Sequence, residues 1–303
     1  MNAIRAEAPP RGRPREGPIG LFFDLFKLRI GLVIGFTALA GVLVAPGPAP
    51  DGWRIALLIF AVVASSAAAG AFNQYVERDL DVQMARTKRR PFVTGRLVHS
   101  RRWLAVIALM AGASVALAAL VANSIAAFYT FAGAFVYGIV YTVWLKRRTP
   151  MNIVIGGLAG SFAVLAGAAA VTPGGLGAVP LWLAVVLFLW TPPHFWSLAI
   201  ACRADYAAAG VPMLPVVVGD ARAARAVLAG TALLVAASLV PALVGLSWLY
   251  AITALASGGY FLWTSIALVR TPDRRTAMAN FHASLVQLTL LLTAAVADAL
   301  LLG

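Results

Sequence analysis

The segment WRIALLIFAVVASSAAAGAFNQY, residues 53–75, runs directly into VERDLDVQMARTKRRP, residues 76–91. The first segment is almost entirely apolar and, as a helix, is long enough to cross a hydrocarbon layer of about 30 Å. The second segment is dense in acidic and basic side chains. A membrane helix that simply ended here would not need this many charges, so the junction predicts a functional site at the membrane surface.

The same apolar pattern recurs along the whole chain. Hydrophobic residues make up 61% of the 303 positions and charged residues only 12%, a balance that excludes a soluble domain of this size. Repeated apolar runs of about 20 residues predict an all-α, polytopic membrane protein. The nine expected spans are 26–45, 53–75, 103–122, 125–145, 152–172, 180–202, 223–243, 246–268 and 281–301. Residues 26–303 should form one transmembrane domain, and residues 1–25, rich in Pro, Gly and Arg, a disordered cytoplasmic tail.

The basic residues are distributed very unevenly between the two sides of the membrane. With nine spans, all of the 24 Lys and Arg residues except Arg54 fall on the side of the N-terminus. The positive-inside rule places the N-terminus and these loops in the cytoplasm. The same rule accounts for the net charge of +13 and removes the case for a nucleic-acid partner. The single cysteine, Cys202, excludes an intramolecular disulfide and a multi-cysteine metal cluster.

One amide and two carboxylates repeat at helical spacing where the second span ends. At 100° per residue, Asn73, Glu77 and Asp81 fall within about 80° of one another on a helix surface. Hard oxygen ligands beside a cluster of Arg and Lys suit a magnesium-bridged diphosphate. The alternative is a solvated helix end in which the two acids pair with neighbouring arginines. Asp79 lies off this face and is expected to form a surface ion pair.

Two basic clusters follow on the same side of the membrane. In the loop after Asp81, Arg86 is the first candidate for a diphosphate contact and Arg90 the second, because a guanidinium forks onto phosphate oxygens. At the end of the fourth span, Lys146 and Arg147 are further candidates. The alternative is that both clusters only fix the topology and attract anionic lipid.

The sixth span combines a predicted helix break with a histidine. Consecutive prolines at 192–193 remove helix hydrogen bonds and are expected to open a kink beside a cavity. His194 and Asp205, eleven residues apart, would share a helix face about 16 Å apart along the axis. His194 would then lie deep and Asp205 at the surface. The alternative for His194 is a hydrogen-bonded interior histidine.

Three tyrosines are candidates to line such a cavity. Tyr137 and Tyr141 lie one helical turn apart near the inner end of the fourth span, and Tyr206 follows Asp205. Electron-rich rings stabilise a developing carbocation by cation–π attraction. Most other aromatic residues near span ends fit an interfacial belt.

These residues resemble a known family through several separated motifs. The pattern N-x-x-x-E-x-x-x-D-x-x-M-x-R-T at residues 73–87 resembles the first acidic motif of the UbiA superfamily of membrane prenyltransferases. More narrowly, the chain is similar to the protohaem IX farnesyltransferase (haem O synthase) branch from about residue 22 onward. The further matches are Tyr141-Thr142…Leu145-Lys146-Arg147, Thr191-Pro-Pro-His194-Phe-Trp, Asp205-Tyr206…Pro212-Met-Leu-Pro215 and, more weakly, Phe281-His282…Ser284-Leu285.

The resemblance implies a nine-helix bundle around a central cavity that opens toward the cytoplasm. It implies that magnesium on a prenyl diphosphate is held by Asn73, Glu77 and Asp81 from one acidic motif and by Asp205 from a second. Ala201 stands where many relatives carry another acid, so the number of magnesium ions stays open. The same carry-over makes Arg86 and Lys146 contacts of the diphosphate, beside the further candidates Arg90 and Arg147.

The implied reaction transfers a farnesyl group from farnesyl diphosphate to a vinyl group of haem b, and water completes the product, haem O. His194 could orient a haem propionate, act as a base toward the water or ligate iron. The implied setting is the bacterial inner membrane, with a downstream haem A synthase or oxidase assembly factors as partners. Alternatives are prenylation of an aromatic quinone precursor and, more distantly, transport, although the inverted repeat of a transporter is missing from the sequence.

Overall fold

The computed structural model describes residues 17–302, in which every regular element is a helix. Residues 1–16 of the predicted tail lie outside the described part of the chain. The predicted tail is wrong from Pro18 onward, because α1 (Pro18–Phe26) is a helix with proline in its first turn. Leu25 and Phe26 bury their side chains against α3 (Gly52–Val76), and this burial explains why the segment folds.

The predicted all-α membrane bundle is confirmed. Within residues 17–302, eight helices are long and apolar enough to cross a membrane, and a pair bent by 57°, α1 with α2, makes a ninth span. The spans after α1 are α2 (Leu28–Val44), α3, α5 (Arg102–Val121), α6 with η1 (Ser124–Phe135 and Val136–Leu145), α7 with α8 (Asn152–Gly156 and Leu158–Val171), α9 (Ala178–Ala201), α12 with α13 (Asp220–Ser238 and Val240–Val244), α14 (Trp248–Arg270) and α15 (Arg274–Leu301).

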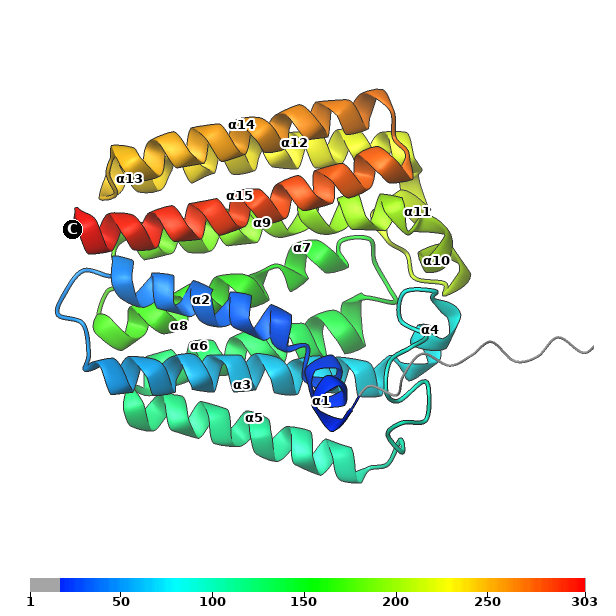
Figure 1. Ribbon diagram of the computed structural model, residues 1–303, viewed down its shortest axis with the longest axis horizontal. Helices are drawn as coiled ribbons and strands as arrows, with labels where there is room; N and C mark the ends of the chain where they lie inside the picture. The colour runs from blue at the N-terminus through cyan, green and yellow to red at the C-terminus, as the bar shows by residue number, and fades with distance from the viewer. Residues whose placement is uncertain (1–16, 303) are drawn as a thin grey trace, which may run out of the picture.

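The helices form two groups. Helices α2, α3, α5, α6 and α8 pack on one another in one group, and α9, α12, α14 and α15 in the other. The groups touch mainly where α2 meets α15 and where α7 and α8 meet α9, with a smaller contact between α2 and α9. Three short helices, α4 (Arg78–Gln83), α10 (Arg203–Ala208) and α11 (Leu214–Val218), gather at the end of the bundle opposite the C-terminus (Figure 1).

Helices α2 and α8 approach so closely that only glycine fits at two positions. A Cβ atom on Gly41 would lie 2.1 Å from the carbonyl oxygen of Val164, and one on Gly167 would lie 1.9 Å from that of Ala38. Small residues allow such backbone contact between membrane helices. The crossing of α2 and α8 forms the side of the first helix group that faces α9 and α15.

Prolines 192–193 do not divide the sixth span into two helices, and the kink predicted there stays a prediction. Helix α9 continues through both prolines, which remove the N–H donors for the carbonyls of Phe188 and Leu189. The Thr191 hydroxyl donates to Leu187 O, and the Ser197 hydroxyl donates to Pro193 O. Helix α9 ends instead at Ala201, so Asp205 lies on the separate helix α10 and the expected shared face with His194 does not exist.

The first span is the one with a sharp bend, 57° between α1 and α2. Lys27 adopts a left-handed conformation, with φ 48° and ψ 43°, between α1 and α2. It is the one non-glycine residue with positive φ among residues 17–302. Such a conformation costs of order 1 kcal/mol and usually marks a functional position.

Candidate active site

The first acidic motif keeps one helical register although the helix is interrupted. Helix α3 ends at Val76 and α4 begins at Arg78, with Glu77 between them. The Glu77 N–H still donates to Asn73 O at 3.0 Å, and the Asp81 N–H donates to Glu77 O at 2.9 Å. The side chains of Asn73, Glu77 and Asp81 are all buried. The i, i+4, i+8 spacing therefore does bring them to one face.

Two basic side chains from different segments close on these carboxylates. Lys146 Nζ donates to Glu77 Oε1 at 2.6 Å, across 69 residues of sequence. Arg90 Nη1 donates to both oxygens of Asp81, at 2.8 and 2.6 Å, and lies 3.8 Å from Glu77 Oε2. Buried charges need close, hydrogen-bonded partners of opposite charge, because each charge loses several kcal/mol of hydration free energy on burial. Both basic residues were candidates from the sequence.

The turn after α4 explains why Arg90 and not Arg86 reaches the acids. The Thr87 hydroxyl donates to Asp81 O, and the Arg90 N–H donates to Thr87 O, so the chain folds back over α4. Arg86 is exposed and lies beside Tyr206 instead. The order of preference expected from the sequence, Arg86 before Arg90, is reversed for contact with the carboxylates.

Lys27 is a third basic residue of this cluster, and the sequence reasoning missed it. Its Nζ donates to Asn73 Oδ1 at 2.7 Å and to the Tyr137 hydroxyl at 3.1 Å. The Asn73 amide in turn donates to Thr142 Oγ1 at 3.1 Å, which holds the amide in place. In the sequence, Lys27 is a basic residue at the start of an apolar span, where the positive-inside rule already accounts for it.

Helix η1 places several of these groups on the face toward α3. In an α-helix, Tyr137 and Lys146, nine residues apart, would point about 180° away from each other. Helix η1 is a π-helix, in which the Lys146 N–H donates to Tyr141 O five residues earlier. Its wider turn lets Tyr137 meet Lys27 while Lys146 meets Glu77.

The electrostatics separate the buried motif from its exposed neighbour. Burial raises the pKa of the Asp81 carboxyl, and Arg90 opposes that shift. Asp79 forms the expected surface ion pair, bidentate with Arg147 at 2.8 Å, and this hydrogen bonding lowers its pKa. Arg147, the fourth candidate for a diphosphate contact, is thus directed to Asp79 and is not brought into the cluster.

The second acidic motif lies next to the first but is built differently. Asp205 is half-buried on α10, and its carboxylate makes no hydrogen bond or ion pair with any described residue, although its backbone oxygen accepts from Ala209 N–H. The adjacent Tyr206 is buried and packs with Leu80 and Met84, which brings α10 against α4. Among residues 17–302, no three His, Cys, Asp or Glu side chains gather closely enough to hold a metal by themselves.

The acidic motif nevertheless fits magnesium that is shared with a diphosphate. Glu77 Oε2 is buried without a hydrogen-bond partner, and hard oxygen atoms of this kind are the ligands that Mg²⁺ prefers. Mg²⁺ usually takes only one or two protein carboxylates and completes its shell with substrate phosphates and water. Few protein ligands per ion are therefore expected at such a site.

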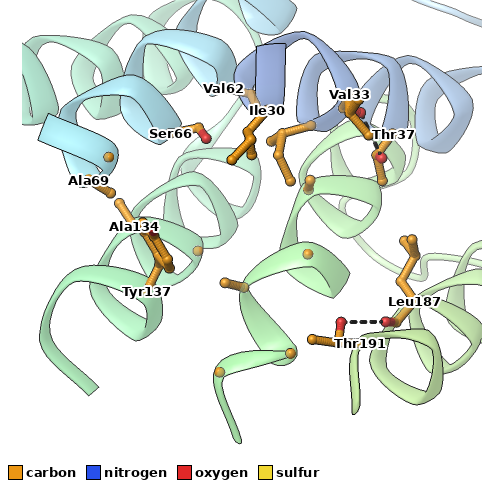
Figure 2. A pocket seen from close by; sticks show the side chains of 18 of the residues that line it. Ile30, Val33, Thr37, Val62, Ser66, Ala69, Ala134, Tyr137, Leu187 and Thr191 are labelled. Carbon is orange, nitrogen blue, oxygen red and sulfur yellow. Dashed lines mark hydrogen bonds between the residues drawn. The ribbon is translucent and has the colours of Figure 1, made fainter. Parts of the chain in front are cut away.

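An apolar cavity of about 360 Å³ begins at Lys27 and Tyr137 and extends between the two helix groups. Helices α2, α3, α6, η1, α7, α8, α9 and α15 contribute to its wall, mostly with alanine, glycine and branched aliphatic residues. Figure 2 shows Leu187 and Thr191 of α9 across the cavity from Ala134 and Tyr137. Of the three candidate tyrosines, Tyr137 lines this cavity. The ring of Tyr141 stacks on the ring of Tyr137, with 5.8 Å between their centroids.

His194 lies in the wall of the same cavity. Its ring is stacked between Trp190, at 4.1 Å between centroids, and Phe281, at 4.5 Å. Its Nδ1 lies 2.6 Å from the Ser284 hydroxyl oxygen. Phe281 and Ser284 belong to the weak motif of the last span, and these contacts bring that motif against His194.

The comparisons with known proteins agree with this geometry. Residues 34–291 match the UbiA prenyltransferase family. The chain belongs to this family. A bundle of membrane helices that joins an acidic motif to an apolar cavity is therefore the scaffold of a membrane prenyltransferase.

Individual relatives extend over nearly the whole chain. It is 57% identical to Protoheme IX farnesyltransferase 2 of Paramagnetospirillum magneticum over 280 residues, which are 92% of this chain and 97% of the relative. A solved structure of digeranylgeranylglyceryl phosphate synthase has a TM-score of 0.75 at 17% identity and covers 93% of this chain and 98% of its own. A UbiA homologue from Archaeoglobus fulgidus, bound to DMAPP and Mg²⁺, has a TM-score of 0.65 at 16% identity, with coverages of 89% and 98%.

Proposed function

We propose that this protein transfers the farnesyl group of farnesyl diphosphate to a vinyl group of haem b and so produces haem O. The observation that carries the prenyl-transfer part is Lys27, which bonds the acidic motif through Asn73 and also lines the apolar cavity. One residue thus joins a polar end suited to diphosphate with an apolar space suited to an isoprenoid chain. The choice of haem as acceptor is supported by the 57% identical relative.

Three basic side chains would bind the leaving group. Lys27, Arg90 and Lys146 converge on the motif from three separate segments and can transfer their hydrogen bonds to diphosphate oxygens. Magnesium would be held there by Asn73, Glu77, Asp81 and Asp205 together with the diphosphate, and it would neutralise charge as the C–O bond breaks. Arg86 remains a candidate for a further contact from the exposed side.

The cavity wall would protect the allylic cation. Its apolar lining excludes water until the vinyl carbon has attacked farnesyl C1. Tyr137 is placed where the diphosphate end meets the cavity, so its ring can stabilise the developing positive charge. Tyr141 and Tyr206 support this corner by packing, next to Lys146 and α4 respectively.

The proposed setting is the bacterial inner membrane with the cluster on the cytoplasmic side. The uneven distribution of Lys and Arg supports this orientation. Single cysteines introduced near 96, 148 and 222, with Cys202→Ser as background, should react with an impermeant thiol reagent only after cells are permeabilised. Labelling of any of these loops in intact cells would contradict the orientation. The product would then pass to a haem A synthase or to oxidase assembly factors.

The acceptor is tested by weighing the products. Purified protein is incubated with farnesyl diphosphate, Mg²⁺ and either haem b or 4-hydroxybenzoate. We expect a haem adduct heavier by one farnesyl group and one hydroxyl and no prenylated benzoate. A prenylated benzoate with unchanged haem would instead identify a prenyltransferase of the quinone branch. Loss of product in excess chelator is expected from the proposed use of Mg²⁺.

A further inference from the structure

The cavity wall away from the acidic motif contains one nitrogen base. The ionisable lining residues of the cavity are Lys27, Arg29, Tyr129, Tyr137 and His194. Lys27 Nζ is already bonded to Asn73 and to the Tyr137 hydroxyl at the polar end, and arginine and tyrosine side chains have no nitrogen lone pair that can accept a proton. A neutral histidine ring has one such lone pair. Among the lining residues, His194 is therefore the side chain placed to take a proton from a molecule reacting in the apolar part of the cavity.

The hydrogen bonds of Ser284 decide which nitrogen of His194 carries hydrogen. The Ser284 hydroxyl lies 2.6 Å from Phe281 O and 2.6 Å from His194 Nδ1. The carbonyl of Phe281 can only accept, so the single hydroxyl hydrogen of Ser284 goes to that carbonyl. The serine oxygen must then accept hydrogen from Nδ1–H. In the neutral ring, Nε2 consequently has a free lone pair.

The ring is also held rigidly. Trp190 and Phe281 stack on its two faces, and the indole N–H of Trp190 donates to the backbone oxygen of Ser284 at 2.9 Å. Ser284 thus fixes both the stacked tryptophan and the histidine tautomer. No described residue forms a hydrogen bond to Nε2, while the ring contributes to the cavity wall.

We infer that His194 Nε2 is the base that deprotonates the water which completes the product, and that Ser284 is its positioning residue. The inference rests on the proposed function. In that reaction the C1–O bond of farnesyl diphosphate breaks, and diphosphate leaves with the electron pair. The vinyl π electrons form the new C–C bond to farnesyl C1, which leaves a positive charge on the vinyl carbon next to the macrocycle.

The water molecule then resolves this cation. Its oxygen bonds to the charged carbon, and His194 Nε2 takes one water proton, so that a neutral hydroxyl group forms and the imidazolium later releases the proton to solvent. Without a base at this place, the same cation is quenched by loss of a proton from carbon, which gives an alkene. The two outcomes differ in mass by one water, so the product itself reports on the base.

The test compares His194→Asn with the intact protein. The asparagine amide can still donate to Ser284 in place of Nδ1–H, but it has no basic nitrogen at the position of Nε2. We expect the variant to release diphosphate and join farnesyl to haem, with most product lacking the elements of water. His99→Asn is the matched control, because His99 is an exposed histidine bonded to Tyr75 O away from the cavity. It should make hydroxylated product like the intact protein.

Three results would overturn the inference. The first is hydroxylated product from His194→Asn at an unchanged rate. The second is loss of diphosphate release together with all adducts in a folded variant, which would place His194 in an earlier step. The third is a shifted absorption spectrum of bound haem with unchanged product, which would make Nε2 an iron ligand. If the intact protein makes no haem adduct at all, the proposed function itself fails, and this outcome is distinct.

Ser284→Ala tests the positioning role separately. Without the serine oxygen, the neutral histidine can place its hydrogen on Nε2, so the fraction of alkene product should lie between those of the intact protein and His194→Asn. The KM for haem should stay unchanged. Ser257→Ala is the matched control, since Ser257 is a buried serine that bonds only Thr253 O on its own helix. An unchanged product ratio in Ser284→Ala would contradict the assignment of the tautomer to Ser284.

Discussion

The two acidic segments of this protein lie side by side but have opposite surroundings. In residues 73–81, each motif side chain is buried and already bonded to a basic residue from another helix or loop. On α10, Asp205 is half-buried and its carboxylate has no partner among residues 17–302. The first segment is organised by the protein alone. We therefore expect Asp205 to join the site through a bound ligand, such as magnesium on a diphosphate, that also contacts the first segment.

The largest expected effect comes from neutralising a carboxylate of the first segment. Glu77→Gln or Asp81→Asn should reduce turnover by about 10³-fold, because these groups support charge that develops in the transition state. Each change also removes the nearest carboxylate partner of a basic side chain, Lys146 for Glu77 and Arg90 for Asp81. Thermal unfolding must therefore be measured beside activity. Full activity in a folded variant would remove this segment from the catalytic site.

Asp205→Asn should cost less, about 10²-fold, and in a different way. Because Asp205 has no protein partner to lose, stability should not change. Its contribution would come through the bridging metal, so activity should recover partly as Mg²⁺ is raised. Glu77→Gln should not recover in this manner. Equal Mg²⁺ dependence in both variants would abolish the contrast between the two segments.

Lys27→Met should lower kcat/KM for farnesyl diphosphate by about tenfold, as expected for loss of one charged hydrogen bond. The reason is that Lys27 is the basic residue of the cluster that also borders the cavity. Lys88→Met is the control, since Lys88 is an exposed lysine of the same charged segment. If the two variants behave alike, Lys27 contributes only to topology.

The smallest effect is expected at Asp79. Its side chain and that of Arg147 are 59% and 42% exposed, so their ion pair should contribute less than about 1 kcal/mol to stability. Asp79→Asn should change activity less than about twofold, because the pair lies outside the buried cluster. A loss comparable to that of Asp81→Asn would mean that charge in this segment matters regardless of burial.

The fold could be predicted largely because the membrane imposes a simple rule. An apolar run of about 20 residues must form a helix, so the spans follow from composition alone. The first span was harder, since its bend depends on a left-handed Lys27 that no local pattern announces. The prolines of α9 led to the opposite error, because a break was expected where the helix is continuous from Ala178 to Ala201.

The site could be predicted where its residues share a helix and not where they meet across helices. Asn73, Glu77 and Asp81 follow from spacing on one element. The partners Lys27 and Lys146 lie 46 residues before and 69 residues after their acceptors, and only tertiary packing pairs them. The choice between Arg86 and Arg90 depends on how the loop folds back over α4, which is set by the hydrogen bonds of Thr87.

The π-helix η1 sets how far the chain turns between Tyr137 and Lys146. In an α-helix the nine residues from one to the other would place the two side chains about 180° apart, whereas the wider π-helical turn keeps both on the face toward α3. Substitutions in 136–145 that favour α-helical hydrogen bonding should therefore swing Lys146 away from Glu77 and lower activity, even where every residue of the cluster is unchanged. Selection for activity should act on the winding of this helix as well as on the side chains that it carries.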